Sequence, residues 1–396
     1  MVICGIVSEY NPFHKGHEKH ISLTREKTGA DMVICAMSGN FVQRGEPAVF
    51  DKWTRAACAL MGGADAVIEL PLLSAIQSAE GFASGGVRVL AAAGADSISF
   101  GCETDDIALL ERIAQTLSAE TGDYKEELKR QLKEGLSFPK ARMIAALQGE
   151  NEELFLPNAI LGIEYIKAIL KNKLEMKPYA VKRIGEEYHS TDIEAQYASA
   201  TAIRCAIEGG DFDAAYNAMP EACAGYVRQS IDAGLLPAMP QCFDRELLYA
   251  LRRGGREYIA SLPDVSEGLE NRIYDAADSC GSRAELIAKV KTKRYTYTRI
   301  SRILLCALLG VTKNMIDEHN RRDIGYIRIL GVRNRDVLSQ LSRSSSVPLI
   351  TGSVSGSQYN AADLRASDIY ALSQKAAPFR CVARDLTEKL IILEVD

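Results

Sequence analysis

The sequence lacks the features of a membrane-spanning or disulfide-bonded protein. It contains no uninterrupted run of about 18 apolar residues, so no segment could cross a bilayer as a helix. No basic segment precedes an apolar core at the N-terminus, so we expect no secretory signal peptide. None of the ten cysteines forms a Cys-x-x-Cys pair, which argues against a disulfide framework and a structural zinc site. We therefore expect a reduced, cytoplasmic protein without membrane contact.

Several common catalytic motifs are also missing. The sequence contains no GxGxxG, GxxxxGKS/T, GxSxG or HExxH, which disfavours a dinucleotide enzyme, a P-loop nucleotidase, an α/β-hydrolase and a zinc protease. Cys102 has no histidine near it in the sequence, so we expect this thiol to pack as a small apolar group. Histidine is scarce, but three of the five histidines fall within seven residues, at His14, His17 and His20.

The first hundred residues alternate between strand-length and helix-length patterns. Short apolar runs lead into helical segments that glycine closes, which is typical of βαβ units and a parallel sheet. The predicted strands are Val2–Val7, Met32–Ala36, Ala66–Leu70 and Ser97–Phe100, with another at Pro178–Arg183. The predicted helices are His17–Thr28, Asp51–Met61, with Asp51 as its N-cap, and Glu80–Ala93. The predicted fold class is α/β, with a Rossmann-like parallel sheet.

A proline-containing stretch divides the chain in two. From Gly234 to Cys242 the sequence GLLPAMPQC breaks the preceding pattern. We expect a catalytic α/β domain over residues 1–235 and a mainly helical region over residues 236–396. Residues 283–335 contain thirteen Lys and Arg but only four Asp and Glu, although the whole chain has a formal net charge of −5. A basic surface on an acidic body indicates a docking site.

The tetrapeptide HKGH (residues 14–17) lies where the first predicted strand ends and the first helix begins. Histidines three positions apart share a helix face, and the free N–H groups at a helix start favour a phosphate. Imidazoles there can stabilise charge on an α-phosphate as pyrophosphate leaves, and Gly16 permits close approach of a nucleotide. The alternatives are a solvated helix start and a zinc site, for which only Glu9 and Glu18 are nearby acidic ligands. The pattern favours nucleotide binding.

The tetrapeptide belongs to a longer run with a recognisable resemblance. The HxGH spacing resembles the signature of the nucleotidyltransferase superfamily, which includes the class I aminoacyl-tRNA synthetases. The whole run GIVSEYNPFHKGHEKHI (Gly5–Ile21) resembles the N-terminus of the bacterial tRNA(Met) cytidine acetate ligase family. Further stretches resemble the same family, in order along the chain: Ser99–Glu103, Leu156–Tyr165, Val181–Gly185, Tyr188–Ser190 and Ala198–Arg204.

The resemblance implies which residues bind ATP and which act in catalysis. It implies an ATP site along the first loop and helix, formed by Val7, Ser8, Glu9, Tyr10, Asn11, Pro12, Phe13, His14, Lys15, Gly16, His17, Glu18, Lys19 and His20. It adds Gly101, Asn158, Arg183, Thr201 and Arg204 to this site, and it makes His14 and His17 the catalytic residues. The residues alone allow other roles. Gly101 is equally well explained as a turn glycine. Asn158 is better explained as a helix N-cap, and the alternative for Arg183 is an ordinary surface arginine. Ala200 stands where the superfamily often has serine, which leaves one hydroxyl contact to the phosphates in question.

A second candidate site is basic. The stretch Lys291–Arg302 precedes an apolar helical run. If this stretch is helical throughout, a cationic face with tyrosine points outward, as suits an RNA, although a solvated helix face is the alternative. The candidate RNA-binding residues are Lys291, Lys293, Arg294, Tyr295, Arg299 and Arg302. We expect this face to lie remote from the nucleotide pocket.

The resemblance implies an ATP-dependent acetate ligase. Such an enzyme activates acetate as acetyl-adenylate, releases pyrophosphate, and acetylates N4 of the wobble cytidine of elongator tRNA(Met). The triphosphate implies Mg²⁺, bound mainly by the phosphates, since no carboxylate cluster and hence no protein metal ligand is evident. No obligatory protein partner is evident. The alternatives are an adenylyltransferase for a small phosphorylated metabolite and a nucleotide-regulated RNA-binding protein without chemistry.

Overall fold

The structure is a computed structural model that describes residues 1–119, 121–136, 138–147, 154, 156–183, 193, 197–352, 361–381 and 384–393. The stretch Tyr188–Ser190 and the last two residues of Val181–Gly185, which carry part of the family resemblance, lie outside these residues. Within the described ranges, no helix combines the length and the apolar character needed to cross a membrane.

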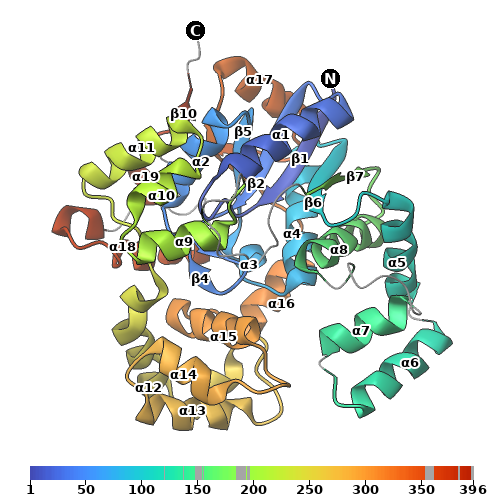
Figure 1. The fold of residues 1–396 in the computed structure, drawn as a ribbon, viewed down its shortest axis with the longest axis vertical. Coiled ribbons are helices and arrows are strands. Elements are labelled where there is room, and N and C mark those ends of the chain that lie inside the picture. The colour runs from blue at the N-terminus through green and yellow to red at the C-terminus, as the bar shows by residue number, and fades with distance from the viewer. Residues whose placement is uncertain are drawn as a thin grey trace.

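A mainly parallel sheet forms the centre of the structure (Figure 1). Across the sheet, the described strands follow the order β10 (Ile391–Ile392), β8 (Ile327–Val332), β5 (Ala66–Leu70), β2 (Met32–Ser38), β1 (Ile3–Ser8), β6 (Ser97–Cys102) and β7 (Lys177–Lys182), and β9 (Leu349–Thr351) also pairs with β8. The strands from β5 to β7 run parallel, because helical crossovers return the chain to the same edge before each strand. The predicted α/β class and the predicted strands of the first half are confirmed.

Each face of the sheet carries its own apolar cluster. Successive residues of β2 enter opposite clusters, with Met32, Ile34 and Ala36 on one face and Val33, Cys35 and Met37 on the other. The first face is covered by helices that include α3 (Leu72–Ala75), α4 (Ala79–Ala92) and α8 (Pro157–Lys171). The second face is covered by helices that include α1 (Lys15–Thr28), α2 (Lys52–Met61), α9 (Ala200–Glu208), α10 (Phe212–Asn217) and α11 (Glu221–Asp232).

The predicted helix ends around the first strands are also present. Asp51 caps α2, because its Oδ1 accepts a hydrogen bond from Thr54 N at 2.8 Å. Gly29 ends α1 in the left-handed conformation, with φ of 64°. Gly86 lets α4 lie close to β1, since an added Cβ would come within 2.6 Å of Val7 Cγ2. Local sequence signals therefore placed these elements correctly.

The C-terminal part of the chain returns to the central sheet. β8 pairs antiparallel with β5, and β9 and β10 pair with the outer edge of β8. The expected division at residue 235 did not include this return, because a strand's partner distant in sequence leaves no local signal. The described helices of this part are α12 (Asp244–Ser261), α13 (Leu269–Ser279), α14 (Arg283–Val290), α15 (Tyr297–Leu309), α16 (Lys313–Arg321), α17 (Arg335–Ser344), α18 (Ala361–Ala371) and α19 (Arg384–Thr387).

Two groups of helices extend below the sheet in Figure 1. The group α12–α15 lies at the lower left, and α6 (Gly122–Lys133) and α7 (Phe138–Leu147) lie at the lower right, below α5 (Ile107–Ala119). We call α12–α15 the helical lobe. The expectation of one helix through Lys291–Arg302 is wrong: α14 ends at Val290 and α15 begins at Tyr297. Between them the Thr292 hydroxyl accepts a hydrogen bond from Tyr295 N at 3.1 Å, which stabilises a turn.

A short hairpin joins the helical lobe to the sheet. It consists of β3 (Phe41–Val42) and β4 (Glu46–Pro47), and its turn contains Gly45 with φ of 79°. Gly45 O accepts hydrogen bonds from Ser301 Oγ at 2.9 Å and from Arg283 Nη2 at 3.2 Å. An added Cβ at Gly45 would overlap the backbone of Ser301 and Arg302. The close approach therefore requires glycine, and it fixes the hairpin to α14 and α15.

A buried ionic cluster fastens the C-terminal segment to the sheet. Lys52 Nζ lies 2.7 Å from both Glu69 Oε1 and Asp385 Oδ2, and Arg328 Nη1 lies 2.8 Å from the same Asp385 oxygen. All four side chains are buried. Burial raises the pKa of Asp385, but the charges of Lys52 and Arg328 outweigh it and lower that pKa. Each charge is therefore tolerated in the interior only because the others are present.

We expect Asp385→Ala to lower the free energy of unfolding by about 3–5 kcal/mol, because it leaves the buried cations of Lys52 and Arg328 undercompensated. Urea denaturation followed by circular dichroism measures the change. The control is Asp275→Asn, which removes an exposed ion pair with Arg256 and should leave the midpoint unchanged. An unchanged midpoint for Asp385→Ala would show that the cluster does not hold the C-terminal segment in place.

Candidate functional site

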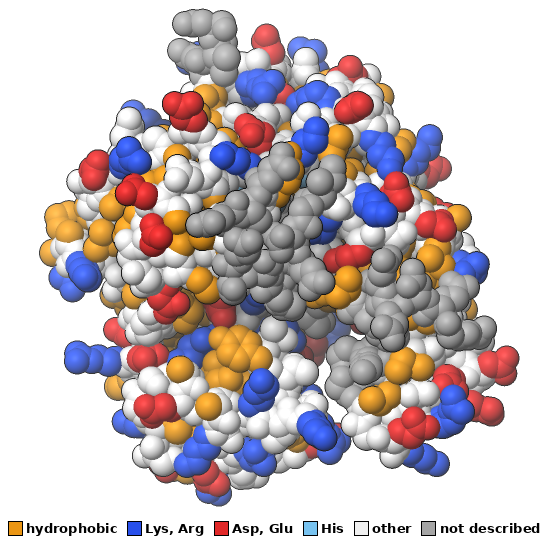
Figure 2. All heavy atoms as spheres, viewed as in Figure 1, with side chains coloured by type: hydrophobic (Ala, Val, Ile, Leu, Met, Phe, Trp, Pro, Cys, Tyr) orange, Lys and Arg blue, Asp and Glu red, His pale blue; other side chains and the backbone are white. Residues whose placement is uncertain are grey.

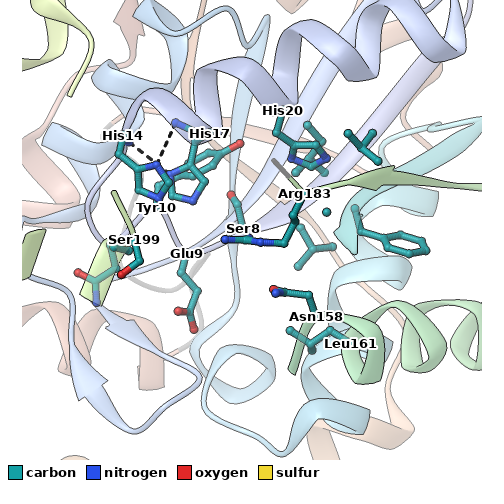
Figure 3. Close-up of a pocket in the computed structure, with 18 of the residues that line it drawn as sticks. Ser8, Glu9, Tyr10, His14, His17, His20, Asn158, Leu161, Arg183 and Ser199 are labelled. Atoms are coloured by element: carbon teal, nitrogen blue, oxygen red, sulfur yellow. Dashed lines mark hydrogen bonds between the residues drawn. The ribbon is translucent and has the colours of Figure 1, made fainter. Parts of the chain in front are cut away.

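A pocket lies at the carboxyl ends of β1, β6 and β7, the edge at which parallel sheets bind ligands (Figure 3). Ser8 ends β1, Gly101 lies near the end of β6, and Arg183 follows β7 directly. The first residues of α1 and α9 and the hairpin β3–β4 also line it. The fold thus gathers residues from segments that are far apart in the sequence.

His14 and His17 present the same ring nitrogen to this pocket. His14 is the N-cap of α1, and its Nδ1 accepts a hydrogen bond from Gly16 N at 3.1 Å. His17 Nδ1 accepts one from His14 N at 3.3 Å (Figure 3). Because Nδ1 is the acceptor in each neutral ring, the proton lies on Nε2. Capping the helix therefore leaves two Nε2–H donors for a ligand.

Burial keeps these imidazoles neutral. The His14 and His17 rings stack with their centroids 3.6 Å apart. Burial, followed by the charges of Arg183 and Arg204, lowers the pKa of His14 to about 3. Burial is also the main cause that lowers the pKa of His17 well below its usual value, and with Arg183 it lowers the pKa of His20 to about 4. The histidines therefore add no positive charge to the pocket, which Arg183, Arg204 and the lysines Lys19 and Lys182 also line.

Arg204 and Arg183 reach the pocket from different elements, and they differ in whether their guanidinium groups already form hydrogen bonds. Arg204, on α9, donates from Nη1 to Asn11 O at 2.7 Å and from Nη2 to Thr201 Oγ1 at 3.3 Å. The Arg183 guanidinium forms no hydrogen bond or ion pair with a described residue, and Figure 3 shows it extending toward Ser8. Arg204 therefore holds the loop before α1, whereas Arg183 is available to an anion.

Asn158 is oriented by Glu103. It is the second residue of α8 rather than its N-cap, which is Leu156. Asn158 Nδ2 donates to Glu103 Oε1 at 2.7 Å, and Ala159 N donates to Glu103 Oε2 at 2.7 Å. Because the amide nitrogen has this partner, the carbonyl oxygen of the same amide remains as an acceptor for a ligand.

The two glycines assigned to nucleotide binding differ in their surroundings. An added Cβ at Gly16 would lie 2.9 Å from His14 Cε1, so a side chain would displace the ring that caps α1. An added Cβ at Gly101 would lie 3.5 Å from Arg183 Cγ, which is an ordinary contact. Packing within the protein therefore requires glycine at Gly16, whereas the role of Gly101 against a nucleotide stays a prediction.

Most of the expected site residues line this one pocket. They are Val7, Ser8, Glu9, Tyr10, Asn11, His14, Gly16, His17, Lys19, His20, Gly101, Asn158, Arg183, Thr201 and Arg204. Four members of the expected run, Pro12, Phe13, Lys15 and Glu18, do not line it. Phe13 is buried against Gly62, and Lys15 Nζ donates to Asn217 O at 2.7 Å. The expectation that every residue from Val7 to His20 lines the site was too broad. Successive side chains of a loop and a helix point in different directions, so some of them face away from the pocket.

The apolar wall of the pocket was not predicted. It consists of Leu23, Phe82, Phe100, Leu161, Tyr165 and Val181. Apolar side chains at helix or strand spacing indicate a core, and nothing local distinguishes a pocket wall from it. Gln43 and Arg44, on the hairpin, were also missed, as were Lys182 and Tyr197. Ser199 could have been found, because serine before a helix is an N-cap signal, and its Oγ accepts from Ala202 N at 3.0 Å.

Two other chemistries lack the necessary groups among the residues that the structure describes. No group of three or more His, Cys, Asp or Glu side chains could hold a metal ion there, so the zinc alternative has no ligand set. Cys102 is fully buried, and burial raises the pKa of its thiol to about 11. The expectation that Cys102 packs as an apolar residue is confirmed.

The predicted RNA-binding residues at the start of α15 face the protein more than the solvent. Tyr295 is buried and so is not available to stack on a base. Arg299 Nη2 donates to Asp264 O at 2.8 Å, and Arg302 Nη2 lies 3.4 Å from Asp264 Oδ2. Tyr297, which was not singled out, is exposed instead. The continuous cationic face expected from helical periodicity is therefore wrong, because the turn before α15 changes the direction of each side chain.

The remaining predicted residues surround that turn. Lys291, Lys293 and Arg294 are exposed, and Arg294 Nη2 forms an exposed ion pair with Glu267 at 2.6 Å. Figure 2 shows other Lys and Arg side chains spread over the helical lobe among acidic ones. α15 contacts Gly45 of the hairpin, and the neighbouring Gln43 and Arg44 line the pocket. The separation between this surface and the pocket stays a prediction.

Comparisons with known proteins agree with this geometry. The HIGH Nucleotidyl Transferase family matches residues 1–385. The tRNA(Met) cytidine acetate ligase of Acetivibrio thermocellus is 39% identical, covering 99% of this chain and 100% of the relative. The tRNA(Met) cytidine acetate ligase of Caldicellulosiruptor saccharolyticus is 41% identical, covering 95% of each chain.

Solved structures of a related protein have the same fold. The apo crystal structure of Thermotoga maritima TmcAL has a TM-score of 0.92 at 34% identity, covering 99% of this chain and 100% of that one. The crystal structure of Thermotoga maritima TmcAL bound with alpha-thio ATP has a TM-score of 0.90 at 33% identity, with the same coverage. The resemblance seen in the sequence is confirmed, and the chain belongs to the tRNA(Met) cytidine acetate ligase family, within the HIGH nucleotidyl transferases.

Proposed function

We propose that this protein activates acetate with ATP and then acetylates N4 of the wobble cytidine of elongator tRNA(Met). The first step releases pyrophosphate and leaves acetyl-adenylate, and the second yields N4-acetylcytidine and AMP. The observation that carries this proposal is the pair of Nε2–H donors on His14 and His17, beside the Arg183 guanidinium, which has no partner among the described residues. The names of the relatives and the alpha-thio ATP complex of TmcAL support the choice of substrates over the adenylyltransferase and non-catalytic alternatives.

The histidine pair suits the first step. Negative charge develops on the α-phosphate as acetate attacks and pyrophosphate leaves, and donors that are already in place stabilise it without reorganisation. The N-termini of α1 and α9 both meet this pocket and favour the phosphates. Mg²⁺ would be bound mainly by phosphates and water, since the described residues offer no carboxylate cluster.

The adenosine part of ATP fits the other side of the pocket. The apolar wall supplies a surface for a base, and it includes Phe100 and Tyr165, whose ring centroids lie 5.6 Å apart. The amide oxygen of Asn158, oriented by the contact of its amide nitrogen with Glu103, would accept from the adenine amine. In this proposal the phosphates would lie between Arg183 and the start of α9.

The tRNA would approach over the hairpin and over the turn between α14 and α15, residues 291–296, which we call the basic turn. Lys291, Lys293 and Arg294 are exposed cations next to α15, and α15 is fixed to the hairpin through Gly45. Cations there would bind tRNA phosphates while a splayed cytidine enters the pocket. The hairpin would link the two sites, so that the cytidine can enter the pocket where acetyl-adenylate forms, before water reaches it.

We expect His14→Ala and His17→Ala each to slow adenylate formation by more than tenfold, because removing one preorganised donor costs roughly 10²-fold. Acetate-dependent ATP–pyrophosphate exchange measures this step. The control is His319→Ala, since His319 bonds to Ser74 outside the pocket and its variant should keep the exchange rate. Normal exchange in folded His14 and His17 variants would exclude a role for the pair in the first step.

We expect Arg183→Ala to weaken ATP–Mg²⁺ binding by roughly 30- to 150-fold, the loss of about 2–3 kcal/mol from a charged bidentate contact. Arg204→Ala should weaken it as well and also loosen the loop at Asn11. Isothermal titration calorimetry measures both affinities. Lys177→Ala, at the opposite end of β7, is the matched control and should bind normally. If the Arg183 variant also binds normally, its guanidinium does not contact the nucleotide.

We expect Lys291→Glu, Lys293→Glu and Arg294→Glu together to abolish acetyl transfer to tRNA at moderate salt while pyrophosphate exchange persists. Each lost phosphate contact removes a salt-dependent term from binding, so the milder alanine variants should flatten the salt dependence of tRNA affinity. Filter binding and tRNA acetylation on one preparation measure the two effects. The control pair Arg335→Glu and Arg343→Glu lies on α17, at the other end of the molecule in Figure 1. Persistent acetylation in the triple variant would mean that tRNA binds elsewhere.

A further inference from the structure

Glu9 is the only carboxylate among the described residues that line the pocket. It follows β1 directly, and Figure 3 shows its carboxylate pointing away from His14 and His17. The resemblance assigned Glu9 to ATP, together with the rest of its loop. A carboxylate is a poor partner for acetate or for a triphosphate, because like charges repel. In the proposed arrangement the adenine amine already has the Asn158 amide as its acceptor, which leaves the Glu9 carboxylate for a donor on the second substrate.

Two contacts from separate elements hold Glu9 in place. Gln43 N, on the hairpin, donates to Glu9 Oε1 at 2.8 Å. Arg55 Nη1, on α2, donates to the Glu9 carbonyl oxygen at 2.6 Å. The second carboxylate oxygen, Oε2, accepts no hydrogen bond from the described residues. Burial raises the pKa of Glu9, although Arg44 and the Gln43 N–H lower it in part. The result is a rigid acceptor with one oxygen left for a ligand.

Cytidine is the substrate that needs such an acceptor. Its N4 amine is the one nucleophile in the proposed reaction that carries protons to lose, and a carboxylate accepts hydrogen bonds from this amine. A base placed in the pocket also contributes most when its pKa lies near the working pH. Glu9 lines the pocket with one carboxylate oxygen unoccupied by the described residues, and the hairpin that holds it also contacts α15 of the helical lobe.

We propose that Glu9 accepts the proton of the cytidine N4 amine during acetyl transfer. The N4 lone pair attacks the acetyl carbonyl carbon, and a C–N bond forms as the acyl C–O bond to the phosphate breaks. AMP leaves with that electron pair, and the N4 proton goes to Glu9 and then to solvent. This inference rests on the proposed tRNA acetylation, and it makes Glu9 a catalytic residue of the second step rather than an ATP ligand.

The test compares the two steps in Glu9→Gln on the full-length protein. We expect acetyl transfer to tRNA, in single turnover from preformed acetyl-adenylate, to fall at least about 100-fold further than pyrophosphate exchange does. In the wild type the transfer rate should rise with pH through the pKa of Glu9 and then level off, because the carboxylate is the active form. Glu9→Gln should lose this rise, and Glu9→Asp should keep it at a lower rate.

A second acetyl acceptor, hydroxylamine, distinguishes a loss of proton transfer in Glu9→Gln from a general loss of folded, active protein. Hydroxylamine attacks acetyl-adenylate without a strong base, so Glu9→Gln should lose much less acetohydroxamate formation than tRNA acetylation. The matched control is Glu46→Gln, on the same hairpin, where the carboxylate contacts Tyr297 OH at 3.1 Å instead of the pocket. It should retain both steps and the wild-type pH profile.

The outcomes are distinct. Equal losses of exchange and transfer in Glu9→Gln would overturn the inference and assign Glu9 to the nucleotide or its magnesium ion. A wild-type pH profile in Glu9→Gln would overturn it as well. A wild-type protein that forms no acetyl-adenylate or acetylates no tRNA would instead refute the proposed function itself.

Discussion

The buried guanidinium of Arg55 is the interaction on which the pocket depends. It lies in the interior and donates to the carbonyl oxygens of Phe50, Glu9, Ser38 and Gly39, so it satisfies the backbone where β1 and β2 end. Where parallel strands end at one edge of the sheet, their last carbonyl groups have no partner strand to bond to. The Arg55 guanidinium supplies hydrogen-bond donors to these carbonyl groups instead. Together with Gln43 and Arg204, which bond to Glu9 and Asn11, it fixes the path of the loop that leads to α1.

The start of α1 uses the same hydrogen bonds for folding and for chemistry. Orphan N–H groups at a helix N-terminus need acceptors, and here the Nδ1 atoms of His14 and His17 supply them. That requirement sets the tautomer of both rings and turns their Nε2–H groups toward the pocket. Burial then keeps the rings neutral, so the pair donates hydrogen bonds without adding charge, and Arg183 provides the charge.

The hairpin β3–β4 connects the two halves of the proposed reaction. Its Gln43 holds Glu9, and its Gly45 is held by Ser301 and Arg283 of the helical lobe. The proposed nucleotide site lies at the edge of the sheet and the proposed RNA surface lies on separate helices, so the hairpin is a contact that connects the two elements. Because Gly45 has no Cβ, the two backbones approach closely enough for the lobe to set the position of the pocket's rim.

The family resemblance identified about half of the residues that line the pocket, because these lie in short motifs at strand and helix ends. Local signals also predicted the parallel strands and the cap at Asp51. The tautomers of the histidines, the availability of Arg183 and the burial of Tyr295 were not predictable, since each depends on contacts between distant segments. The same is true of β8 beside β5 and of the ionic cluster of Lys52 and Asp385. The sequence by itself determined which groups can do chemistry, through local patterns of a few residues. Only the tertiary structure decided which of them meet, because burial and long-range pairing are properties of the packed chain.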